Sequence, residues 1–111
     1  MSTPDTTVPE WKQMLTEETR HVEDVLREHF EQVDAYRYNS ASIRVRIVDS
    51  RFKELSWEKQ DELVEPILEQ LDADTNADIM GLVLLYPGEV SDSFQASMNN
   101  MEFEHPSPSM L

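Results

Sequence analysis

The chain contains no cysteine among its 111 residues and only two glycines. Without cysteine it can form no internal disulfide, no thiolate nucleophile and no cysteine-ligated metal cluster. Because its two glycines, Gly81 and Gly88, stand apart, it has no glycine-rich loop that would cradle a phosphate. No apolar run approaches the length that spans a membrane. These absences exclude several classes of catalytic and cofactor-binding protein.

Basic residues are also scarce. Nine Lys and Arg stand against 23 Asp and Glu, which gives a formal net charge of −14 at pH 7. Such a charge repels nucleic-acid phosphates and anionic lipid headgroups, so we expect neither nucleic acid nor a membrane as a partner. The first ten residues, MSTPDTTVPE, have neither the basic nor the apolar region of a signal peptide. The expected location is therefore the cytoplasm.

The few bases are concentrated in residues 37–53, where Asp49 is the single acid. Three of these bases, Arg44, Arg46 and Arg51, form an arginine cluster in the sequence. One interpretation is that they pair with the acidic helices on either side. The other is that they form a site for a small anion or an acidic partner on the sheet. The sequence favours the first interpretation and leaves the second open.

The most regular pattern in the chain begins at Ile43. Ile43, Val45 and Ile47 alternate with Arg44 and Arg46, which predicts a strand with one apolar face and one basic face. Asp and Ser residues directly after this strand favour a turn. The strand therefore ends in a sharp corner.

A strong amphipathic helix is predicted after the corner, from Ser56 to Leu71. Ser56 is a good N-cap, and Glu58 places negative charge in the first turn. Pro66 falls inside the helix and predicts a bend, because the apolar pattern continues in phase across it. The predicted buried stripe comprises Trp57, Gln60, Val64, Ile67, Leu68 and Leu71.

The remaining elements follow from similar patterns. Residues 9–30 have helical spacing, and residues 33–38 predict a strand that forms an antiparallel hairpin with 43–48. Residues 72–78 predict a polar loop. Residues 79–86 (IMGLVLLY) are apolar at almost every position and predict a strand parallel to the second one, joined by a right-handed crossover.

The predicted fold is α+β, with the order α-β-β-α-β and a three-stranded mixed sheet whose helices lie on one face. We expect residues 1–8 to be disordered and residues 9–90 to form a single domain. Residues 91–111 are expected to be a tail with a short helix followed by disorder.

The motif around the corner resembles that of the BolA-like family. Its residues are Val48-Asp49-Ser50-Arg51-Phe52, then Ser56, then Leu63-Val64 along the helix, with Leu68 beyond. The closing Tyr86-Pro87-Gly88-Glu89 is similar to the end of the family's last strand. The resemblance covers about residues 22–90 and implies the family's α-β-β-α-β fold, which is related to type II KH domains.

The chain departs from the family at the positions that carry its function. The arginine-histidine-arginine triplet of the family's helix is replaced by Gln60, Asp61 and Glu62. A family glycine is Glu54, and the histidine that often enters the last strand falls near Asp78. The resemblance implies an iron–sulfur role with monothiol glutaredoxins, or a DNA-binding role. We expect neither here, because carboxylates match such clusters poorly and an acidic helix repels DNA.

Two acidic patterns resemble metal-binding motifs only in part. Glu18 and His21 have the Glu-x-x-His spacing of di-iron bundles, but no second copy of the motif exists. Residues 72–78 carry alternating oxygen ligands but lack the central glycine and the closing glutamate of a calcium loop. No serine has an obvious histidine partner. We therefore predict no metal, no cofactor and no enzymatic activity.

The last strand predicts a surface for association. One set of its side chains faces one side of the sheet and comprises Ile79, Gly81, Val83 and Leu85. The residues between them, and Tyr86, face the other side. Because both sets are apolar, one would be left on the open face of the sheet, where monomers seldom leave so large a patch bare. The patch assigned to a partner or oligomer comprises Met80, Leu82, Leu84 and Tyr86.

We consider two kinds of cover for this patch. One is the segment from Val90 to Met101, where Val90, Phe94, Met98 and Met101 have helical spacing. The other is a second copy of the chain or a partner protein, and the sequence slightly favours self-association. The predicted function is a noncatalytic, BolA-like protein-interaction module. The alternative is a domain that binds or transforms a small anion at Arg44, Arg46 and Arg51.

Overall fold

The structure is a computed structural model that describes residues 9–109. The disorder predicted for residues 1–8 lies outside the described residues, as do residues 110 and 111.

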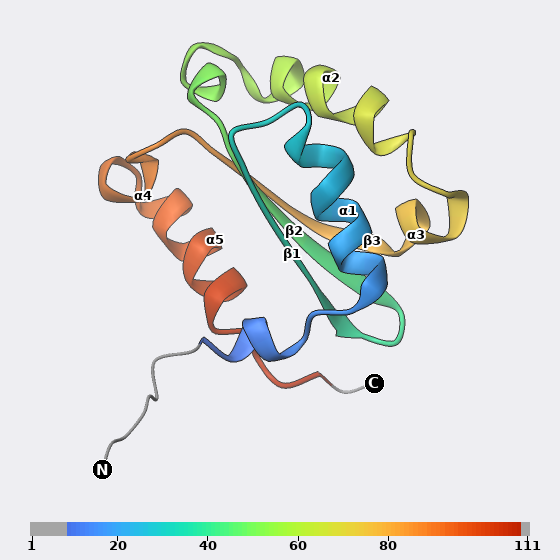
Figure 1. Cartoon of the computed structure of the whole chain (residues 1–111). Helices are drawn as coiled ribbons and strands as arrows, with labels where there is room; N and C mark the ends of the chain where they lie inside the picture. The colour runs from blue at the N-terminus through green and yellow to red at the C-terminus, as the bar shows by residue number, and fades with distance from the viewer. Residues whose placement is uncertain (1–8, 110–111) are drawn as a thin grey trace.

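A mixed three-stranded sheet forms the centre of the molecule (Figure 1). Strands β1 (Gln32–Asn39) and β2 (Ser42–Val48) form an antiparallel hairpin, and β3 (Ile79–Leu85) lies parallel to β2 on its other side. The strand order is therefore β1-β2-β3, with β2 in the middle and β3 at an edge. The predicted α+β class, the element order and the mixed sheet are confirmed.

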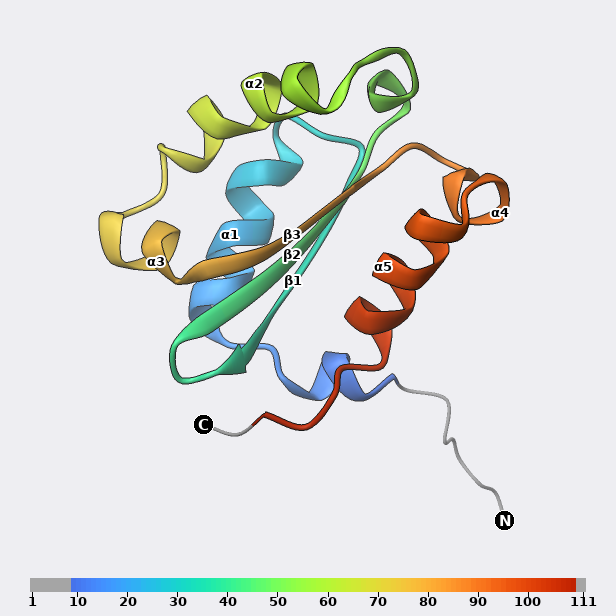
Figure 2. The same ribbon diagram turned by 180° about the vertical axis from the view of Figure 1, so that it is seen from behind.

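Helices α1 (Glu17–Arg27) and α2 (Trp57–Leu68) cover the first face of the sheet (Figures 1 and 2). The alternation in β2 has the expected result, because Ile43, Val45 and Ile47 are fully buried under these helices. The rest of the buried core on this face consists of Val22, Leu26, Phe30, Val33, Ala35, Phe52, Val64 and Leu71.

The corner after β2 is built by two capping side chains. Asp49 accepts from the backbone N–H of Arg51 at 3.0 Å and so begins the 3₁₀ helix η2 (Ser50–Glu54), which buries Phe52 against the core. Ser56 then accepts from the N–H of Lys59 at 3.3 Å and begins α2, as predicted. Each cap satisfies a backbone donor that would otherwise lack a partner at the start of a helix.

The N-terminal helix begins later than residue 9. A 3₁₀ helix, η1 (Glu10–Gln13), comes first, and Thr16 and Thr19 then cap the start of α1 with two reciprocal hydrogen bonds. This capping box ends any continuous helix from residue 9 to residue 30. It also turns Trp11 away from the first face of the sheet. A second local difference is α3 (Ala73–Asp78), a short helix capped by Asp72, where the sequence predicts a loop.

The second face of the sheet is covered by the chain itself. After β3, Gly88 adopts φ 89°, a left-handed conformation that favours glycine, and the chain turns through α4 (Glu89–Asp92) into α5 (Phe94–Glu104). Helix α5 lies across the sheet opposite α1, with η1 beside its C-terminal end (Figure 2). The preference for a second copy as the cover is therefore wrong, although association of copies elsewhere stays a prediction.

A small aromatic core holds α5 to the sheet. Trp11 from η1, Tyr36 from β1 and Phe103 from α5 are all buried in one cluster. The ring centroids of Tyr36 and Phe103 lie 4.8 Å apart in an edge-on arrangement, and the Tyr36 hydroxyl donates to the Phe103 carbonyl at 2.8 Å. The segment after α5 continues along β1, because Tyr38 donates to the carbonyl of Ser107 and Asn39 donates to the hydroxyl of Ser109.

Candidate functional site

The structure does not bring the three predicted arginines together. Arg44 and Arg46 lie on the second face of the sheet, under α5, whereas Arg51 lies in η2 at the corner after β2. Each of the three forms an ion pair with an acid of this chain. The arrangement therefore favours the interpretation in which these bases pair with nearby acids.

Arg46 is the most enclosed of the three, with 8% of its side chain exposed. Its guanidinium forms ion pairs with Asp34 of β1 at 2.8 Å and with Glu104 of α5 at 2.7 Å, and donates to the Asn100 side chain at 2.8 Å. The guanidinium carbon also lies 4.6 Å from the centre of the Phe103 ring. Arg46 thus joins a strand to a helix that is distant in the sequence.

Arg44 makes a similar connection between β2 and α5. Its guanidinium lies 3.7 Å from the centre of the Tyr38 ring, pairs with Glu102 at 3.1 Å and donates to the Tyr36 hydroxyl at 3.3 Å. Burial raises the pKa of the Tyr36 phenol above its ordinary value. Gly81 of β3 leaves room for this arginine, because an added Cβ would lie 3.1 Å from its Cγ.

Arg51 stabilises the corner after β2 and forms no part of the sheet face. It donates to both carboxylate oxygens of the buried Asp49, at 2.8 Å and 2.9 Å, and to the carbonyl of His29 at 2.6 Å. The hydrogen bonds from Arg51 lower the pKa of Asp49 below its ordinary value. These two residues of the BolA-like motif therefore have a structural task in this chain.

The contribution of Arg46 can be measured. Replacing Arg46 with alanine should lower the free energy of unfolding by about 2 kcal/mol, because Asp34 and Glu104 lose their charged donor. Lys59→Ala is the matched control, since Lys59 pairs with Glu62 in the open and such pairs contribute less than about 1 kcal/mol. Urea melts of both variants compare the two losses. Equal losses would show that Arg46 does not hold α5 to the sheet.

The residues assigned to a partner surface divide into two pairs. Leu84 and Tyr86 pack against the core under α1 and α2. Met80 and Leu82 are left outside, with 73% and 37% of their surface exposed. An irregularity in the pairing between Ile43 and Arg44 of β2 shifts the register at Met80, so the strict alternation predicted for β3 fails at its start.

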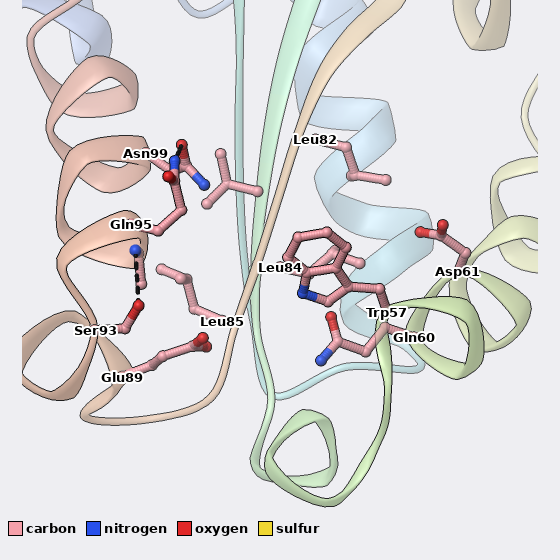
Figure 3. A pocket seen from close by; sticks show the side chains of 12 residues that line it. Trp57, Gln60, Asp61, Leu82, Leu84, Leu85, Glu89, Ser93, Gln95 and Asn99 are labelled. Carbon is pink, nitrogen blue, oxygen red and sulfur yellow. Dashed lines mark hydrogen bonds between the residues drawn. The ribbon is translucent and has the colours of Figure 1, made fainter.

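A groove runs along β3 between α2 and α5. Its volume is about 310 Å³, and its floor consists of residues 82–85. Trp57, Gln60 and Asp61 of α2 lie on one side of β3, and Ser93, Gln95 and Asn99 lie on the other (Figure 3). The groove is open, with apolar and polar side chains on the α2 side and mainly polar ones on the α5 side. An open groove of this kind lacks the enclosure that is typical of small-molecule and catalytic pockets.

Trp57 is the residue that the sequence pattern misplaced. It is in phase with the buried stripe of α2, yet it is the first residue of the helix, lies beside β3 and is 82% exposed. In the rest of the stripe, Val64 and Leu71 are buried as predicted, whereas Gln60, Ile67 and Leu68 are half-buried. Trp57 and Leu82 thus leave apolar surface exposed along the groove.

The backbone at the floor of this groove has free hydrogen-bonding groups. Leu85 accepts from the N–H of Asp49 at 2.9 Å, which turns the backbone of Leu85 toward β2. In a parallel pair, the backbone groups of alternate residues point toward the same neighbouring strand. The N–H and C=O groups of Val83 therefore also point toward β2, while those of Leu82 and Leu84 point outward. The next outward N–H, that of Tyr86, is already bound by the Glu89 carboxylate at 3.1 Å.

Helix α5 leaves its apolar stripe in solvent. Phe94, Met98 and Met101 are exposed, and the side chains that α5 buries are Ala96 and Phe103. The stripe predicted to cover the sheet therefore points away from it. The polar residues of α5 would have identified its true contact face. Asn100, Glu102 and Glu104 bind the arginines of β2.

The residues with metal-binding spacing do not converge. Within residues 9–109, no three His, Asp or Glu side chains are grouped closely enough to hold a metal ion. Glu18 instead pairs with Arg37 of β1 at 3.0 Å, and Asp72 caps α3 through the N–H of Thr75 at 3.0 Å.

Comparison of the chain with protein-family models, with curated proteins and with solved structures finds no match. The resemblance to the BolA-like family thus stays a prediction from the motif. Across residues 9–109, none of the helices has the length and apolar character needed to cross a membrane.

Proposed function

We propose that this chain is a noncatalytic protein-interaction module that binds a partner at the groove between α2 and α5. The observation that carries the proposal is the exposed apolar surface of Trp57 and Leu82, which line the groove at the open edge of β3. The proposal places the module in the cytoplasm and gives it no cofactor. A BolA-like origin is compatible with it, since the motif residues that support the fold are present.

The positions of the arginines also support this function over anion binding. Arg44 and Arg46 lie beneath α5 and are paired there, so an anion would have to compete with Glu102, Asp34 and Glu104. Arg51 is committed to Asp49. The exposed apolar surface, in contrast, has no partner within the described part of the chain.

The test is capture of a partner from a lysate of the native cells, with the full chain immobilised. The variant Trp57→Gln should lose at least about 90% of any protein captured by the parent chain, because truncating a central aromatic contact costs about 2 kcal/mol or more. The Trp57 side chain is largely exposed, so the variant should fold as the parent does.

Phe94→Gln is the matched control. Phe94 is as exposed as Trp57 but lies on the outer side of α5, away from the groove. The control should capture the same protein to the same extent. Capture that survives in Trp57→Gln, or that disappears only with Phe94→Gln, would place the interaction away from the groove and contradict the proposal for this site.

A further inference from the structure

We propose that the partner enters the groove as an extended, basic segment and pairs with β3 as a fourth strand of the sheet. This inference rests on the proposed function and specifies the chemistry of the partner. Three independent features carry it: the free backbone groups of β3, the side chains on either side of them, and the charge of the groove.

The backbone supplies the pairing. Leu82 and Leu84 direct their N–H and C=O groups away from β2, so the edge offers two donors and two acceptors in the spacing of a strand. Unpaired strand edges are the natural template for a further strand. The bond from Tyr86 to Glu89 closes the edge beyond Leu84. The pairing is therefore confined to a short stretch centred on residues 82–84.

The side chains on the two sides of the edge match the alternation of an added strand. On the α2 side, Trp57 and Leu82 offer apolar contact. On the α5 side, Gln95 and Asn99 lie next to each other, joined by a hydrogen bond of 3.0 Å, and offer amides to polar groups. An incoming strand that alternates apolar and polar residues would thus place each kind against its complement.

The charge selects a basic occupant over a second copy. The groove is lined by Asp61 and Glu89 and by no lysine or arginine. The whole chain carries a net charge of −14. Two copies meeting edge to edge would bring like charges together, whereas lysine or arginine residues in the partner would be attracted to both the groove and the surrounding surface.

The test uses the full chain and a dye-labelled octapeptide of alternating lysine and valine as the probe. A peptide with the same lysines but with proline in place of each valine keeps the charge and cannot pair as a strand. Fluorescence polarisation should give at least about 10-fold tighter binding for the lysine–valine peptide, since backbone pairing contributes more than one hydrogen bond. An alternating glutamate–valine peptide should not bind.

The variant Leu82→Pro isolates the backbone contribution. Proline removes the N–H of residue 82, which points outward, so the hydrogen bonds between β2 and β3 can remain. The added strand would lose a donor at this position and would clash with the proline ring. The preference for the lysine–valine peptide should disappear. Leu82→Ala loses the same apolar contact but keeps the N–H, so it is the control and should retain the preference for the lysine–valine peptide over the lysine–proline peptide. A folded Leu82→Pro chain that retains the full preference would overturn the proposal.

Hydrogen exchange gives a second readout that needs no variant. In the free chain, the amides of Leu82 and Leu84 should exchange faster than that of Val83, which faces β2. The lysine–valine peptide should slow exchange at Leu82 and Leu84 by at least about 10-fold. Slowing elsewhere, or equal binding by the glutamate–valine peptide, contradicts the inference. So does a dimer of the chain alone that protects the same two amides.

The outcomes separate this inference from the proposed function. Partner capture that depends on Trp57 but is unchanged by Leu82→Pro would keep the interaction module and refute strand pairing. Absence of any groove-dependent capture would refute the proposed function, whatever the peptides do.

Discussion

Replacement of Phe103 by alanine is expected to lower the free energy of unfolding by about 3–5 kcal/mol, the usual range for a buried phenylalanine. The Phe103 ring is 2% exposed and lies between Trp11 and Tyr36, with ring centroids 5.4 Å and 4.8 Å away. The variant would leave a cavity in the small aromatic core. It would also remove the ring over which the Arg46 guanidinium lies.

The size of this effect follows from the dependence of α5 on the sheet. Helix α5 has 11 residues, and isolated helices of that length are marginal in water. Phe94→Ala in the same helix is the matched control, because Phe94 is 82% exposed and its removal should change stability by less than about 0.5 kcal/mol. Denaturant melts measure both. A loss for Phe103→Ala no greater than that for Phe94→Ala would mean that α5 does not pack as described.

Replacement of Asp49 by asparagine should cost about 3 kcal/mol at pH 7, because it removes a buried charge with four donors. The carboxylate accepts from the backbone and guanidinium of Arg51 and from the backbone N–H of Glu31 at 3.1 Å. An amide in its place would set an N–H against one of these donors. The corner between β2 and α2 would then lose the contact that joins it to the start of β1.

The same substitution predicts a pH dependence. Hydrogen bonds from Arg51 lower the pKa of Asp49 in the folded chain below the unfolded value of about 3.8. The stabilisation is therefore complete above that unfolded value and is lost as pH falls through the lower folded pKa. The difference in stability between parent and Asp49→Asn should be constant from about pH 7 to 5 and should narrow below about pH 4.

Asp24→Asn is the control for this pH series, because Asp24 is an exposed aspartate on α1. It should change stability by less than about 0.5 kcal/mol at any of these pH values. Urea melts between pH 3 and pH 7 measure the three chains. A difference between parent and Asp49→Asn that stays constant below pH 4 would contradict the assigned role of the Asp49 carboxylate.

The sequence correctly predicted a helix in the C-terminal tail, but it did not predict which side of that helix is buried. Phe94, Met98 and Met101 are the apolar stripe, and an apolar stripe is usually the buried one. The second face of the sheet, however, carries Arg44 and Arg46. Arginines under a helix need oxygen acceptors, so α5 turns its acids and Asn100 inward and leaves the methionines outside.

The sequence by itself determined the elements that depend on local pattern. The alternation in β2, the apolar run of β3 and the cap at Ser56 act over a few residues, and each element formed where they predicted it. Thr16 shows the limit of this reasoning, because its capping box lies inside a pattern that otherwise continues as one helix.

Only the tertiary structure decided which side of α5 faces the sheet, which arginines meet which acids, and that Trp57 lies beside an open strand edge. These depend on contacts between residues up to about 70 positions apart, such as Tyr38 with Ser107 and Arg46 with Glu104. The groove along β3 belongs to this second group. Its floor is backbone, and backbone groups become a site only when neighbouring elements leave a strand edge uncovered.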